Sequence, residues 1–85
     1  MKPTLRIEYC APCNYLPRTL WQVSELMQAI GGDLAGVELV PAGDGVYRVS
    51  VGEHLLFSKK DEGRFPEPSE LLEAAFAVLG QSSSH

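Results

Sequence analysis

The stretch RIEYCAPCNYLPR, residues 6–18, joins two different hydrophobic patterns and contains both cysteines of the chain, Cys10 and Cys13. Before the cysteines, apolar and polar residues alternate, which is typical of a strand with one buried face. The predicted strand covers residues 4–9, and its buried face consists of Leu5, Ile7 and Tyr9. The cysteines therefore stand at the end of a strand.

After the cysteines the apolar residues change to helical spacing. From Asn14 onward they recur at intervals of four, three, four and three, which predicts a helix with one core-facing stripe. Pro17 falls in the first turn of this helix, where a missing N–H does little harm. Gly31-Gly32 predicts that the helix ends there with a glycine in the left-handed conformation. The stripe consists of Leu16, Leu20, Val23, Met27 and Ile30.

Three further strands are expected downstream. The β-rich runs are residues 36–40, 46–51 and 54–58. A cluster of Pro, Gly and Asp over residues 41–45 predicts a turn between the first two runs. Gly52-Glu53 predicts a hairpin between the last two. In the middle run, Tyr47, Val49 and Val51 share one face.

The chain ends in a predicted loop, helix and tail. Residues 59–68 are polar and contain Gly and Pro, which indicates a loop. A helix over residues 69–80 is expected to bury Leu72, Ala75, Phe76 and Leu79. Residues 81–85 show no periodicity, so we expect a flexible tail after a single domain covering residues 1–80.

The element order is β-α-β-β-β-α. A helix between the first two strands makes a right-handed parallel unit, and the hairpin completes one sheet. We therefore expect an α/β (α+β) domain with one mixed four-stranded sheet and two helices, a reduced thioredoxin-like arrangement.

Composition excludes several functional classes. A net charge of −4 argues against nucleic-acid binding, which requires a basic face. No stretch approaches the roughly 18 apolar residues of a membrane span, and the start of the chain has no signal-peptide core. We expect a cytoplasmic protein with no nucleic-acid or membrane partner, either a monomer or a weak homodimer.

The spacing of the cysteines indicates redox chemistry. A helix start lowers a cysteine pKa from about 8.5 toward roughly 3.5 to 7.5, and a C-x-x-C spacer lets one sulfur resolve a mixed disulfide formed by the other. Pro12 rigidifies the loop between them. Cys10 and Cys13 are the candidate catalytic residues, and the candidate site-lining residues are Tyr9, Ala11, Pro12 and Tyr15.

Two other interpretations of the pair are weaker. Zinc prefers four ligands, and only His54 and His85 remain as soft partners, so we expect no metal site within one chain. Two buried cysteines without chemistry are an alternative, but a strand-to-helix junction is a poor place to bury both.

The sequence resembles the Rdx family, the selenoprotein W-like proteins grouped with selenoproteins T, H and V. The resemblance rests on the Tyr-Cys-x-x-Cys segment and on a later hairpin motif, whose residues here are Gly45, Tyr47, Val49, Val51, Gly52, Leu55, Leu56, Phe57, Ser58, Lys59 and Lys60. It implies a thioredoxin-like fold and a thiol redox function linked to glutathione or to a thiol protein partner, without a bound cofactor.

The resemblance leaves the attacking residue open. Family members with selenocysteine carry it at the position matching Cys13, which favours Cys13 as the attacking residue. Analogy with thioredoxins favours Cys10 instead. The favoured function is a thiol-disulfide oxidoreductase, and the alternative is a redox-switched protein-binding module without significant turnover. Trp21 is expected to be a partly buried edge residue rather than a docking aromatic, and Lys59 and Lys60 are either solvated or attract anionic thiols to the site.

Overall fold

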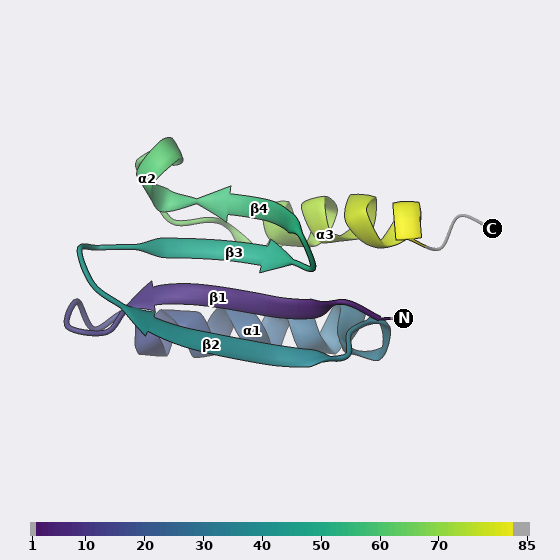
Figure 1. Ribbon diagram of the computed structural model, residues 1–85, viewed down its shortest axis with the longest axis horizontal. Helices are drawn as coiled ribbons and strands as arrows, with labels where there is room; N and C mark the ends of the chain where they lie inside the picture. Colours follow the sequence, from purple (N-terminus) through teal and green to yellow (C-terminus); the bar gives the residue numbers. More distant parts are fainter. Residues whose placement is uncertain (1, 83–85) are drawn as a thin grey trace.

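The structure is a computed structural model that describes residues 2–82 (Figure 1). Its sheet has four strands in the order β2-β1-β3-β4. The strands are β1 (Thr4–Cys10), β2 (Gly36–Ala42), β3 (Tyr47–Val51) and β4 (His54–Ser58). The helices are α1 (Leu16–Ile30), the 3-10 helix η1 (Gly31–Asp33), α2 (Lys59–Glu62) and α3 (Pro68–Ser82). The mixed four-stranded sheet of the predicted α+β fold is confirmed.

Strand β1 lies inside the sheet. It pairs in parallel with β2 and antiparallel with β3, and β3 pairs antiparallel with β4. Helices α1 and α3 contact each other and cover the same face of the sheet (Figure 1). The opposite face carries Arg6 and Arg48, which are exposed. No helix of residues 2–82 has the length and apolar character needed to cross a membrane.

The strand alternation predicted from the sequence is confirmed. Burial of each large apolar side chain contributes roughly 1.5–3 kcal/mol, so the helix-covered face of the two inner strands supplies much of the folding free energy. The side chains on that face are all buried: Leu5, Ile7, Tyr9, Tyr47, Val49 and Val51.

The predicted core stripe of α1 is wrong at most of its positions. Leu16, Leu20 and Met27 are exposed, at 40%, 51% and 36%, Val23 is partly buried, and only Ile30 is fully buried. The buried face of α1 contains Thr19, Gln22 and Leu26 as well as Ile30. Thr19 Oγ1 donates a hydrogen bond to Tyr15 O at 2.9 Å and Gln22 Nε2 donates to Pro66 O at 2.7 Å. These bonds permit polar side chains to be buried.

The stripe predicted for α3 is also rotated. Ala75 is buried as expected, and Leu72 and Leu79 are partly buried, but Phe76 is 53% exposed. Leu71 and Val78 are buried instead. The helix continues to Ser82, two residues past the predicted domain end, and residues 83–85 of the predicted tail lie outside the described part of the chain.

Several predicted boundaries also shift. Helix α1 begins at Leu16 rather than Asn14. Gly31 has a right-handed φ of −56° and the chain continues into η1, so the predicted left-handed end is wrong. The loop predicted over 59–68 begins with the short helix α2, and Pro41 belongs to the edge strand β2 instead of the following turn. An edge strand tolerates proline because an N–H facing outward has no partner in the sheet.

Candidate redox site at the end of the central strand

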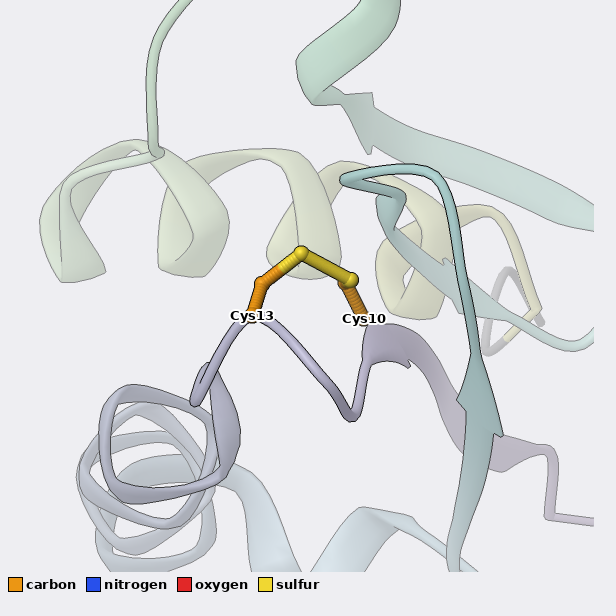
Figure 2. The surroundings of a disulfide bond; sticks show 2 residues. All are labelled: Cys10 and Cys13. Atoms are coloured by element: carbon orange, nitrogen blue, oxygen red, sulfur yellow. A yellow bond between two sulfur atoms is a disulfide. The ribbon is translucent and has the colours of Figure 1, made fainter.

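Cys10 and Cys13 form a disulfide with a Cα–Cα distance of 5.3 Å (Figure 2). Cys10 is the last residue of β1, and Cys13 lies in the turn between β1 and α1. The sequence therefore correctly identified the junction on which the pair stands. Helix α1 begins three residues after Cys13, so the second cysteine precedes the helix instead of forming its first turn.

A tight turn brings Cys13 back toward the strand. Asn14 N–H donates to Ala11 O at 3.1 Å, and Tyr15 N–H donates to Cys10 O at 3.4 Å. Asn14 has a φ of 62°, a left-handed conformation that asparagine tolerates better than most residues. The backbone between the cysteines is thus held by its own hydrogen bonds as well as by the disulfide.

The connection from β2 to β3 passes across the end of β1. Because β1 lies between these two strands, the connecting residues must cross over Cys10. Cys10 N–H donates to Val46 O at 2.9 Å and Ala11 N–H donates to Ala42 O at 3.0 Å. Within the connection, Asp44 and Gly45 have φ values of 59° and 71°. The left-handed pair makes the sharp reversal that keeps this segment against the strand end.

The two cysteine residues differ in exposure to solvent. Cys10 is 0% exposed, whereas Cys13 is an exposed residue. Ala11 and Pro12 between them are also exposed. A molecule approaching from solvent therefore meets Cys13 first.

An aromatic cluster lies on the helix side of this junction. The ring of Phe65 makes edge-to-face contacts with Tyr15 at a centroid distance of 4.9 Å and with Tyr47 at 5.3 Å. Tyr15 and Tyr47 meet at 6.4 Å. The pKa of Tyr47 is raised, mainly because the phenol is buried. The Thr19 side chain and the charge of Arg18 lower this pKa, but by less than burial raises it. The Tyr47 phenol therefore stays neutral near pH 7 and serves in packing.

Two cationic side chains lie over this cluster. The Arg18 guanidinium carbon is 4.2 Å from the Phe65 ring centroid. The Lys59 Nζ atom is 5.6 Å from the same centroid and 5.9 Å from that of Tyr15. Within residues 2–82 neither cation forms an ion pair with a carboxylate. Two cations that no carboxylate of the described residues pairs with directly therefore lie near the disulfide end, where Asp44 and, on α2, Asp61 and Glu62 also occur.

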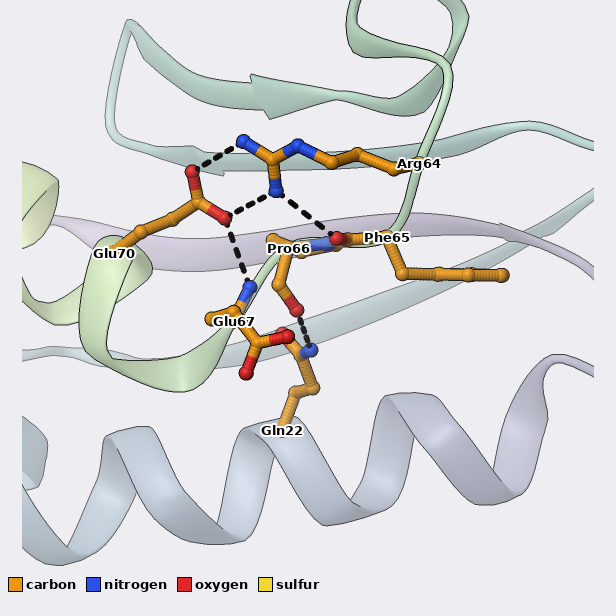
Figure 3. Close-up of polar contacts among 6 residues, drawn as sticks. All are labelled: Gln22, Arg64, Phe65, Pro66, Glu67 and Glu70. Atoms are coloured by element: carbon orange, nitrogen blue, oxygen red, sulfur yellow. Dashed lines mark hydrogen bonds and ion pairs between the residues drawn. The ribbon is translucent and has the colours of Figure 1, made fainter.

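The loop that carries Phe65 is fixed by a set of polar contacts (Figure 3). Arg64 donates two hydrogen bonds to the Glu70 carboxylate, at 2.7 and 2.9 Å, and a third to Phe65 O at 3.2 Å. Glu67 N–H also donates to Glu70 at 2.9 Å, which caps the start of α3. The bonds from Arg64 and then from the Glu67 N–H lower the Glu70 pKa to about 2.

The residues predicted to line the site are placed differently. Tyr15 belongs to the aromatic cluster, and Ala11 and Pro12 are exposed like Cys13, but Tyr9 is a core residue with 8% exposure. Trp21 is 48% exposed, more open than the edge position expected for it. Lys59 Nζ lies 5.9 Å from the Tyr15 ring centroid, and whether it attracts anionic thiols stays a prediction.

Arg18 and Phe65 were not identified from the sequence. Arg18 is a single cation in the first turn of α1, and Phe65 is a single aromatic residue in a polar segment, so neither forms a pattern. In the described residues no group of three or more metal-ligating side chains is assembled. His54 is exposed, and His85 lies outside the described part of the chain.

Comparison with known proteins agrees with this architecture. Residues 4–75 match the model of the Rdx family. A crystal structure of a protein from Bordetella parapertussis is 33% identical and superposes with a TM-score of 0.88, covering 92% of this chain and 99% of the other. A selenoprotein W-related protein from Vibrio cholerae is 26% identical, with a TM-score of 0.88 and coverage of 93% and 99%.

Two curated relatives match a shorter share of their own length. Migration and invasion enhancer 1 from Mus musculus and from Bos taurus are each 33% identical over 70 residues, which is 80% of this chain and 57% of either relative. The chain thus spans little more than half of these relatives. The family match covers the disulfide, the sheet and about half of α3, so the chain belongs to the Rdx family and has the thioredoxin-like fold of a selenoprotein W-related protein.

Proposed function

We propose that the protein is a thiol-disulfide exchange protein in which Cys13 reacts with substrate and Cys10 resolves the product. The observation that carries this assignment is the contrast between an exposed Cys13 and a fully buried Cys10 in one disulfide. Exchange requires a sulfur that a partner can reach and a second sulfur that only the first can reach. Membership of the Rdx family supports a redox role for the pair.

The reaction consists of two exchanges. In the reduced protein, the Cys13 thiolate attacks a substrate disulfide, forms a bond to one substrate sulfur and releases the other as a thiolate. The Cys10 thiolate then attacks Cys13, which forms the intramolecular disulfide and releases the second substrate thiolate. The substrate gains two electrons and the protein loses two. Arg18 and Lys59 favour the thiolate form by placing positive charge near the reacting end.

Reduction of the protein disulfide completes the cycle. A thiolate from glutathione or from a thiol protein attacks the exposed Cys13 sulfur, and Cys10 leaves as a thiolate. A second thiolate then attacks the mixed disulfide and returns Cys13 to its reduced form. This proposal requires thiol partners and no bound metal or organic cofactor.

A redox-switched binding module is the second candidate. The first half of α1, the helix that follows Cys13, carries three exposed apolar side chains: Leu16, Leu20 and Trp21. Exposed apolar side chains close to a reactive group are typical of surfaces that bind other proteins. In this alternative, opening and closing the disulfide changes the affinity of this surface for a protein without significant turnover.

The paired variants Cys10→Ser and Cys13→Ser test the assignment. Each reduced variant is mixed with glutathione disulfide, and the product is identified by intact mass. Cys10→Ser should accumulate a mixed disulfide with glutathione because its resolving sulfur is absent. Cys13→Ser should remain unmodified on the same time scale because its remaining sulfur is buried. The opposite result would assign the attack to Cys10.

Turnover separates the two candidates. The unaltered protein, supplied with excess glutathione and a glutathionylated peptide, should release many equivalents of free peptide thiol per protein. Release of no more than one equivalent, together with partner affinity that depends on the redox state, would favour the binding module.

A further inference from the structure

The apolar stripe that the sequence predicted for the core of α1 is mostly open to solvent. Leu16, Leu20, Val23 and Met27 recur at intervals of four, three and four residues, which places them on one side of the helix. Leu16, Leu20 and Met27 are exposed, and Val23 is partly buried. The sheet covers a different side of α1, so the fold leaves this stripe without a partner element.

The spacing of the stripe suits another helix. Apolar residues at alternating intervals of four and three are the pattern by which helices pack side by side, each side chain entering a space between residues of the facing helix. Ile30 continues the pattern but is buried, so the open part extends from Leu16 to Met27. This part is roughly 16 Å long, which an amphipathic helix of about three turns would cover.

The charges near the stripe favour a cationic partner. The Arg18 guanidinium is directed to the loop before α3, where its carbon lies 4.2 Å from the Phe65 ring centroid. Residues 19–47 of the sequence contain no Lys or Arg. Glu25 on α1 and Asp33 in η1 are exposed and form no ion pair with residues 2–80. A second copy of the chain would bring like charges together at this surface, which costs free energy.

Trp21 is a second feature suited to a cation. It follows Leu20 on α1 and is 48% exposed. The ring face of tryptophan attracts ammonium and guanidinium groups more strongly than other aromatic rings do. Among residues 2–80 no cationic side chain lies over the Trp21 ring. The indole is therefore open to a lysine or arginine of another protein.

We infer that the side of α1 bearing Leu16, Leu20, Trp21 and Met27 binds an amphipathic helix of a partner protein, with lysine or arginine residues beside its apolar stripe. The apolar stripes of the two helices pack together, and the partner's cations approach Glu25 and the Trp21 ring. This inference rests on the binding role of the second candidate function, to which it adds the chemistry of the partner, and not on thiol exchange.

The experiment uses Trp21, the single tryptophan of the chain, as its reporter. The probe is a peptide of leucine and lysine, about 18 residues or five turns long, with leucines at alternating intervals of three and four. A second peptide has glutamate in place of every lysine. Each peptide is titrated into the oxidised and into the reduced protein at low ionic strength. The lysine peptide should shift the Trp21 emission to the blue and saturate at one peptide per protein, whereas the glutamate peptide should not bind.

Two matched pairs of variants locate the binding surface. Leu20 and Leu55 are both 51% exposed, but only Leu20 lies on α1. Leu20→Gln should raise the Kd for the lysine peptide about fivefold or more, and Leu55→Gln should leave it unchanged. Glu25 and Glu53 are both exposed and form no ion pair with residues 2–80. Glu25→Gln should raise the Kd about two- to fivefold, and Glu53→Gln should have no effect.

Three results would overturn the inference. They are an unchanged Trp21 emission with the lysine peptide, equal binding of the glutamate peptide, and an equal loss of affinity in Leu20→Gln and Leu55→Gln. A shift of the emission with protein concentration alone would assign the surface to a second copy and would also overturn it.

The docking surface and thiol exchange fail separately. Equal affinity in the oxidised and reduced protein would support the docking surface and refute the redox switch. Loss of peptide binding would refute the docking surface alone, because thiol exchange is measured by the reaction of the cysteine variants with glutathione disulfide.

Discussion

The disulfide end of the sheet and its open face both carry basic side chains, but the two regions use them differently. On the open face, Arg6 and Arg48 form ion pairs with Glu8 and Glu38, with N–O distances between 3.2 and 3.5 Å. At the disulfide end, Arg18 and Lys59 lie over aromatic rings without a carboxylate partner in residues 2–82.

The difference shows which charges are available for chemistry. Exposed ion pairs contribute at most about 1 kcal/mol to stability, and their charges largely cancel at a distance. A cation over a ring keeps its charge, because an aromatic face supplies only a quadrupole. The open face is therefore a solvated surface, while Arg18 and Lys59 near the disulfide keep charges that no carboxylate of residues 2–82 cancels by direct contact.

The largest expected effect comes from removing the aromatic support of the disulfide end. Phe65→Ala loses contacts with two rings and leaves Arg18 and Lys59 without their common partner. We expect a loss of about 2 kcal/mol in the free energy of unfolding, since Phe65 is partly buried. Denaturant unfolding of the oxidised protein measures it.

The control for Phe65→Ala is a substitution on the open face of the sheet. Leu55 borders a pocket on that face and is 51% exposed, so Leu55→Ala should change the free energy of unfolding by less than roughly 0.5 kcal/mol. Equal losses in the two variants would show that the aromatic cluster contributes no more than a surface side chain, and the comparison would fail.

A smaller effect is expected from Gly45, which turns the chain over Cys10. Its φ of 71° disfavours any side chain, so Gly45→Ala should cost about 1 kcal/mol. Gly52, at the opposite end of β3, has a φ of 60° and should show a similar loss when changed to alanine. Only Gly45→Ala should also change the rate at which glutathione reduces the disulfide. Gly43→Ala, where a Cβ meets nothing within 4 Å, is the unstrained control.

A change in this rate for Gly52→Ala as large as that for Gly45→Ala would contradict the local role of the β2–β3 connection. Thermal unfolding of the glycine variants measures the stability loss, and alkylation followed by mass measures the exchange rate. The two readouts keep a general loss of stability separate from an effect at the disulfide.

The smallest expected effect is a change in the stability of the protein at acidic pH. The Glu70 pKa of about 2 lies below its ordinary value of 4.5, so the unfolded chain takes up this proton first as the pH falls. The stabilisation is fully present above pH 4.5 and is lost as the pH falls toward 2. Glu70→Gln should therefore show a flatter fall in Tm over this interval, whereas Glu38→Gln controls for the change in net charge. Parallel curves for Glu70→Gln and the unaltered protein would refute the role of Glu70.

The strands and the disulfide junction were predictable because their signals are local. Alternation in β1 and β3 reflects which side of the pleat each residue occupies, and C-x-x-C spacing needs only a strand end before it. The parallel pairing of β1 with β2 and the β3–β4 hairpin followed from the connection rules, whereas the position of β1 between β2 and β3 was not predicted. The family resemblance rested on the same local segments.

The helix faces were not predictable from periodicity. The true buried face of α1 includes Thr19 and Gln22, and the Gln22 Nε2 group donates a hydrogen bond to Pro66 O, from a residue distant in the sequence. A pattern that counts apolar residues assigns such a face to solvent. The stripe that it selected instead remains exposed at Leu16 and Leu20, next to the redox site.

The surroundings of the disulfide were predictable only in part. Tyr15 and the lysine pair were identified by their proximity to motifs, whereas Arg18 and Phe65 meet only because the loop after α2 folds against the start of α1. The Arg64–Glu70 contacts fix that loop. Contacts between segments this far apart leave no periodic trace in the sequence.

Pro41 gives the edge strand β2 a further property, which concerns self-association. Beside the disulfide, where an exposed edge would offer a template for another strand, Pro41 lacks an N–H and cannot extend the sheet. A second chain therefore meets an interrupted edge, which disfavours edge-to-edge aggregation through β2.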